Sequence, residues 1–154
     1  MDKNVVKNIT VLSALCGVIL AILALIPVVV KFAVFVLMVC ICIFVILYMR
    51  KQKQLEIFTV KESILVGSLS GLVSYLAFSV LYLPLVFLLS KIFPMAHLGG
   101  LVLFLKLSDF GVVFMYTIFI SMLSVIFNAF SSLLYYYVAS SFEVVKDDKT
   151  FKLK

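Results

Sequence analysis

Long apolar runs separated by short polar segments make up almost the whole chain. A helix needs about 20 apolar residues to cross the hydrocarbon core of a bilayer, which is about 30 Å thick. The pattern therefore predicts an all-α fold, a polytopic membrane helical bundle that forms a single domain over residues 1–154, with a charged cytoplasmic tail over 139–154. Its four transmembrane helices are expected over about residues 9–30, 32–49, 62–92 and 111–138.

The first two runs are expected to form a helical hairpin. Lys31 is the only charge between Ile9 and Leu47, and this stretch is too long for one span and sufficient for two. We therefore expect the turn near Pro27. The second run has no Gly, Ala or Ser after Ala33, so we expect it to face lipid more than protein.

The third run begins with a helix-capping signal. Thr59 is followed three residues later by Glu62, and such a pair can satisfy two free main-chain N–H groups at the start of a helix. This predicts a helix that begins near Val60. Residues 94–110 follow the run and contain an apolar stretch that is too short to cross a bilayer, which predicts a short interfacial element.

Small residues recur every four positions on two of the predicted helices. In a membrane, such faces let two helix backbones approach closely, which is how helices associate where lipid already solvates the apolar side chains. We expect the third run to be the central packing helix. The candidate helix-packing residues are Ser13, Gly17 and Ala21 on the first helix and Gly67 and Gly71 on the third.

The fourth run carries polar residues at alternating spacings of four and three, which places them on one face of a helix. One interpretation is helix packing, with Asn128 hydrogen-bonded across to Ser70, Ser74 or a main-chain carbonyl. The other is the wall of a polar cavity or pore, formed by one chain or by an oligomer. The stripe comprises Thr117, Ser121, Ser124, Asn128, Ser131 and Tyr135.

Composition agrees with this fold and predicts an orientation. The chain is 66% hydrophobic and 13% charged, whereas soluble domains have about 25% charged residues. Of the 13 Lys and Arg residues, three (Lys31, Lys91 and Lys106) lie in the segments that would be outside, and the other ten lie in those that would be inside. Positive residues favour the cytoplasmic side, so we expect a multi-pass protein of the cell membrane with both termini in the cytoplasm.

The plan of the chain resembles a known group of proteins. A hairpin of two spans, a basic loop and a third helix with two glycines are similar to small uncharacterised four-helix membrane proteins of bacteria. The residues that carry the likeness are Arg50, Lys51, Lys53, Gly67 and Gly71. The resemblance implies this architecture and a bacterial inner membrane, and it implies no activity.

The sequence offers no catalytic constellation. Metalloprotease, P-loop, dinucleotide-binding and serine-hydrolase motifs are absent, and no span has an acidic residue at its middle. His97 lies 12 residues before Asp109, and a functional pair of the two is the alternative to an ordinary loop histidine. Cys16, Cys40 and Cys42 lie inside apolar runs, where cysteine behaves as a small hydrophobic residue. We expect no catalytic residue, no cofactor and no metal site.

These observations favour a non-catalytic membrane protein, an accessory or scaffolding component. The expected partners are membrane lipid and either a second copy of the chain, in a homo-oligomer, or another membrane protein. The net charge of +6 is explained by the cytoplasmic loops, and we expect no nucleic-acid partner. The alternative is a small transporter or channel that becomes complete only as an oligomer.

Overall fold

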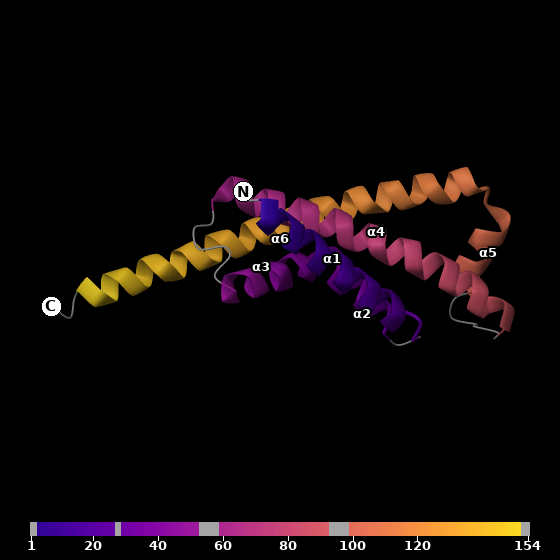
Figure 1. The fold of residues 1–154 in the computed structure, drawn as a ribbon, viewed down its shortest axis with the longest axis horizontal. Helices are drawn as coiled ribbons and strands as arrows, with labels where there is room; N and C mark the ends of the chain where they lie inside the picture. The colour runs from indigo at the N-terminus through magenta and orange to yellow at the C-terminus, as the bar shows by residue number, and fades with distance from the viewer. Residues whose placement is uncertain (1–2, 27–28, 53–58, 93–98, 152–154) are drawn as a thin grey trace.

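The computed structural model describes residues 3–26, 29–52, 59–92 and 99–151 (Figure 1). Every element in these ranges is a helix. They are α1 (Lys3–Leu23), α2 (Val30–Phe35), the π-helical turn η1 (Val36–Cys40), α3 (Ile41–Lys51), α4 (Val60–Ile92), α5 (Gly99–Leu107) and α6 (Phe110–Phe151).

Four helical stretches are long and apolar enough to cross a membrane, which confirms the predicted all-α bundle of a multi-pass membrane protein. The second of them combines α2, η1 and α3 into one span over Val30–Lys51. The first helix begins earlier than predicted, because Lys3 and Lys7 are included in its first turns as exposed residues. Long basic side chains can extend from the end of a helix to water, so a polar end does not stop the helix.

The helix α4 is the central element, as predicted. It packs most extensively against α6 and α1, and it also contacts η1 and α3 (Figure 1). Near the N-terminus α4 and α6 lie together, whereas towards the other end they diverge and are joined through α5 (Figure 1). The described part of the chain is therefore tightly packed at one end and more open at the other.

The second span is the most buried of the four, although its lack of small residues predicted that it faces lipid more than protein. Within its most apolar window, 39% of the residues are buried, the largest share of the four spans. The reason is complementary size: α1 and α4 present small residues, and the large side chains of the second span fill the space beside them. Its buried residues are Ala33, Leu37, Ile41, Cys42, Val45, Ile46 and Met49.

The start of α4 is as predicted. The Thr59 main-chain N–H donates to Glu62 Oε2 over 3.2 Å, and the Glu62 N–H donates to Thr59 Oγ1 over 3.3 Å. This reciprocal pair satisfies two donors that the helix itself leaves free, and α4 begins at Val60.

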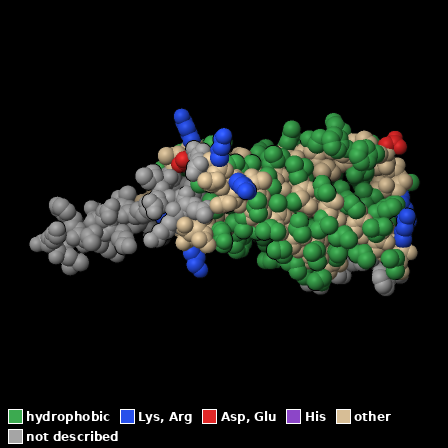
Figure 2. All heavy atoms as spheres, in the orientation of Figure 1, with side chains coloured by type: hydrophobic (Ala, Val, Ile, Leu, Met, Phe, Trp, Pro, Cys, Tyr) green, Lys and Arg blue, Asp and Glu red, His purple; other side chains and the backbone are tan. Residues whose placement is uncertain are grey.

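A short helix, α5, lies within the predicted interfacial element between the third and fourth spans. His97 lies outside the described residues, so the His97–Asp109 pair stays a hypothesis. Figure 2 shows apolar side chains covering the long middle of the molecule, with Lys and Arg side chains at the two ends of this band.

Candidate functional site

The most unusual feature of the bundle is an asparagine side chain placed against a widened helical turn. Asn128 of α6 is fully buried. Its Nδ2 donates to the main-chain oxygens of Leu37 at 3.1 Å and Met38 at 2.9 Å, and its Oδ1 accepts from the Cys42 N–H at 3.1 Å. All three main-chain groups belong to the second span, at and just after η1. We call this arrangement the Asn128 clamp.

The clamp explains why the π-helical turn is tolerated. In an α-helix the Cys42 N–H would donate to Met38, four residues earlier, and in a π-helix to Leu37, five residues earlier. At this turn the Asn128 amide takes the place of both partners. No water reaches the hydrocarbon core to satisfy main-chain groups, so a protein side chain has to do so.

Of the partners predicted for Asn128, the main-chain carbonyl is the one found. The carbonyls that accept its amide across the helix interface belong to the second span. Ser70 and Ser74, the other expected partners, donate instead to Gly67 and Gly71 of their own helix, at 3.0 and 3.3 Å.

Two glycines bring α4 against α6. A Cβ built on Gly67 would lie 2.5 Å from the Asn128 carbonyl oxygen, and one on Gly71 would lie 2.6 Å from the Ser124 carbonyl oxygen. These are main-chain atoms that cannot move aside, so the two positions require glycine. The close approach also allows the Ser124 hydroxyl to donate to the Gly71 oxygen at 3.1 Å.

A third glycine brings α1 against α4. A Cβ on Gly17 would collide with the main-chain oxygen of Ser74. Ser13 and Ala21, one turn on either side, are fully buried on the same face. Ser13 Oγ has no hydrogen-bond partner within the described chain. The structure therefore places the three predicted glycines in close helix contacts and buries Ser13 and Ala21.

A reciprocal serine pair where the start of α4 meets α6 was missed by the sequence analysis. The Ser63 hydroxyl donates to the Ser132 main-chain oxygen at 2.8 Å, and the Ser132 hydroxyl donates to the Ser63 oxygen at 2.7 Å. Ser132 lies four residues after Asn128, so a strict spacing of four from Ser124 would have found it. The alternating pattern selected its neighbour Ser131 instead.

Two of the remaining members of the stripe bond within α6, and Tyr135 bonds to the second span. Thr117 Oγ1 donates to Val113 O at 2.8 Å, and Ser121 Oγ donates to Ile118 O at 2.7 Å, both within α6. Ser131 is buried, and Tyr135 Oη accepts a hydrogen bond from Arg50 at 3.4 Å. The stripe is thus used for packing and for main-chain hydrogen bonds, and the structure brings only Ser124 and Asn128 together with Gly67 and Gly71.

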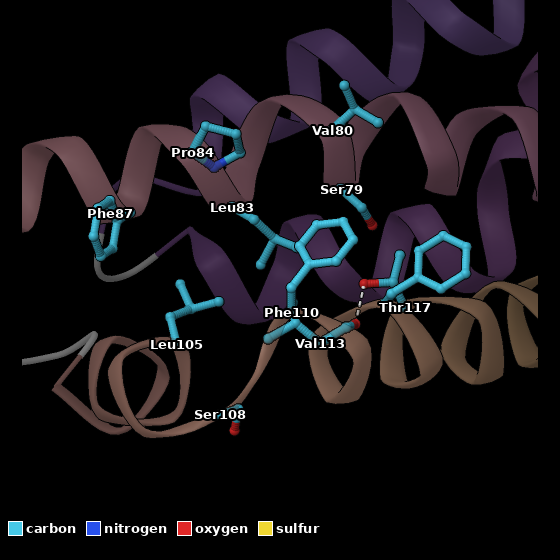
Figure 3. Close-up of a pocket in the computed structure, with 11 residues that line it drawn as sticks. Ser79, Val80, Leu83, Pro84, Phe87, Leu105, Ser108, Phe110, Val113 and Thr117 are labelled. Carbon is cyan, nitrogen blue, oxygen red and sulfur yellow. Dashed lines mark hydrogen bonds between the residues drawn. The ribbon is translucent and has the colours of Figure 1, made fainter.

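A groove opens where α4 and α6 diverge, with α5 at its end (Figure 3). Its volume is about 510 Å³. The walls are mostly apolar, and the Thr117 hydroxyl is already bonded to Val113 (Figure 3). Beside it lies a smaller hollow of about 110 Å³, which shares Ser79, Leu83, Val113 and Thr117 with the groove. Both can receive an apolar group.

In the described parts of the chain, no three His, Cys, Asp or Glu side chains come together in a way that could hold a metal ion. The three cysteines are free thiols. Comparisons with models of protein families, with curated proteins and with solved structures found no match. The function is therefore argued from the geometry of this chain alone.

Proposed function

We propose that the chain is a non-catalytic component of the cell membrane, an accessory or scaffolding protein that associates with a second copy of itself or with another membrane protein. Both termini lie in the cytoplasm in this proposal, which rests on the distribution of Lys and Arg.

The observation that carries the proposal is that polar side chains of the stripe are bonded within the protein. A transport path needs polar groups that remain available to a solute, and intramembrane polar residues mark such paths when they face a cavity. Here Asn128 is bonded to the second span and Ser124 to Gly71. The groove between α4 and α6 borders the stripe only at Thr117.

A second observation concerns the surface of α6. Only 11% of its most apolar window is buried, the smallest share of the four spans. Exposed apolar side chains follow one another at spacings of four, three and four residues, and so share one face of the helix. They are Met115, Phe119, Met122 and Ile126. This face is available to a neighbouring protein or to lipid.

Cross-linking tests the proposal. In a variant whose three cysteines are replaced by alanine, a single cysteine is placed at Phe119 or at Ile126, and cells are treated with a thiol cross-linker. We expect a covalent dimer, or an adduct of one defined larger mass. The matched control is a cysteine at Leu15 or Ile22 of α1, which are also exposed and apolar.

Equal, low cross-linking at both sets of positions would contradict association through α6. The transporter or channel alternative is tested by reconstituting the protein in vesicles and measuring the flux of ions and small polar solutes. Flux that Asn128→Leu abolishes, while the variant remains folded, would replace the proposed function by the alternative.

A further inference from the structure

Two hollows lie next to each other along the seam between α1 and α3. One, of about 470 Å³, is lined by residues that include Lys7, Leu12 and Tyr48. The other, of about 350 Å³, is lined by Leu12, Cys16, Phe44, Leu47, Tyr48 and Lys51. The two hollows adjoin at Leu12 and Tyr48, and we call them together the α1–α3 groove.

The length of this groove corresponds to one leaflet of a bilayer. Its lining on α1 runs from Lys7 to Cys16, and nine residues of helix rise about 14 Å. Half of a hydrocarbon core of about 30 Å is about 15 Å. The groove thus extends from the end of the molecule that carries the N-terminus to about the middle of the membrane (Figure 1).

The polar end of the groove is positively charged. Lys7 lines one hollow and Lys51 lines the other, and both side chains are exposed. Gln52 adds an amide to the hollow that Lys7 lines. Neither lining contains a carboxylate. Basic pockets between transmembrane helices are typical sites for the phosphate of an anionic lipid.

Below the charges the lining becomes apolar. Leu12, Leu15, Phe44 and Leu47 follow along the two helices, and Leu15, Phe44 and Leu47 are exposed. Tyr48 lies between the two parts, with its aromatic ring on both hollows. Aromatic residues favour this depth, where hydrocarbon meets the headgroups. Along the groove the lining changes from basic to aromatic to apolar. One phospholipid changes in the same order, from its phosphate through the interface to its acyl chains.

We propose that the α1–α3 groove binds one anionic phospholipid of the adjoining leaflet. Its phosphate lies between Lys7 and Lys51, and an acyl chain follows the seam past Tyr48 towards Cys16. The charge complementarity selects an anionic lipid over a zwitterionic one, whose own cationic group would lie near the two lysines. This site is independent of the association proposed for α6, because it lies on other helices.

The absence of tryptophan from the sequence permits a direct test. Tyr48→Trp introduces a single fluorophore in the groove. The full-length protein is reconstituted in phosphatidylcholine vesicles that contain increasing fractions of brominated phosphatidylglycerol or, separately, brominated phosphatidylcholine. Bromine quenches tryptophan on contact, so the two titrations give the relative affinity of the groove for the two lipids.

We expect a preference of roughly five- to thirty-fold for phosphatidylglycerol, because each lysine near the surface contributes about a five-fold factor. Lys7→Gln and Lys51→Gln should each reduce it about five-fold, and the double variant should remove it. Both side chains are exposed, so their loss leaves the core intact. Lys31→Gln, in the first turn of α2, is the matched control and should leave the preference unchanged.

A second reporter distinguishes binding in the groove from the general attraction of anionic lipid to a protein with net charge +6. Phe130→Trp lies on an exposed part of α6 and should show no preference. Equal quenching by the two lipids at position 48 would overturn the proposal. The same preference at positions 48 and 130, or a preference that survives the double lysine variant, would also overturn it.

Discussion

The main-chain N–H of Cys42 donates to the side chain of Asn128, 86 positions further along the chain, over a distance of 3.1 Å. The same amide group donates to the carbonyls of Leu37 and Met38. One side chain on α6 therefore completes the main-chain hydrogen bonds of another span. The π-helical turn of the second span therefore depends on a side chain of the fourth span.

The Asn128 clamp predicts the effect of Asn128→Leu. The change leaves the Cys42 N–H and two carbonyls without their partner, and an unsatisfied buried group costs about 1–3 kcal/mol. Since unfolded chains in a membrane also find partners, we expect a total loss of about 1–3 kcal/mol. Thermal unfolding in detergent measures it. Thr117→Val, which removes a hydroxyl bonded within α6, is the control and should cost less.

An unchanged melting temperature for Asn128→Leu would mean that the second span returns to a regular α-helix without cost. That rearrangement would rotate the following turns and expose side chains that are now buried, such as Val45 and Ile46. A cysteine placed at Val45 would then react with a membrane-permeant thiol reagent in the variant only.

The glycine contacts predict how Gly→Ala substitutions, which add one methyl group each, change the stability of the bundle. Gly17→Ala and Gly67→Ala should each destabilise the bundle by about 1–3 kcal/mol, because the new Cβ meets main-chain atoms. Gly111→Ala is the matched control, since a Cβ there has nothing within 4 Å. In a helix, Ala is favoured over Gly by about 1 kcal/mol, so this control should be neutral or stabilising. Equal melting temperatures for all three variants would contradict the close packing.

The Ser63–Ser132 pair predicts a measurable coupling. Interhelical hydrogen bonds in membrane proteins contribute about 0.6 kcal/mol on average and up to about 1.7 kcal/mol. Because the two serines exchange two bonds, we expect a coupling near the upper value in a double-mutant cycle with Ser63→Ala and Ser132→Ala. Additive effects of the two changes would show that the bonds add nothing to the bundle.

The proposed orientation predicts the accessibility of two exposed positions at opposite ends. In the variant without native cysteines, a cysteine at Leu107 should react with an impermeant reagent added to intact cells. One at Gln52 should react only after the cells are opened. Labelling of position 52 in sealed cells would reverse the orientation.

The parts of the fold that follow from local pattern could be predicted from the sequence. The apolar runs give the spans, Thr59 and Glu62 give the start of α4, and Gly67 and Gly71 identify a close contact. Each of these features depends on residues that are close together in the chain. The residues of each segment are therefore enough to determine the feature.

The partner of Asn128 could not be predicted in the same way. The π-helical turn has no signature in the run from Val36 to Cys40, which is as apolar as its neighbours. It depends on a side chain about 90 positions away. The comparatively high burial of the second span could not be predicted for a related reason, since it depends on the small residues of its neighbours and not on its own composition.

The close contacts of α4 have a mechanical consequence. Gly17 of α1 meets Ser74, and Gly71 meets Ser124 of α6, so main-chain atoms of both neighbours contact α4 within about one turn. Such contacts leave no space for the helices to slide or rotate against one another. Beyond this level α4 and α6 separate (Figure 1). A change in the width of the groove between them would therefore involve the half of α4 that follows Gly71 and leave the preceding half in place.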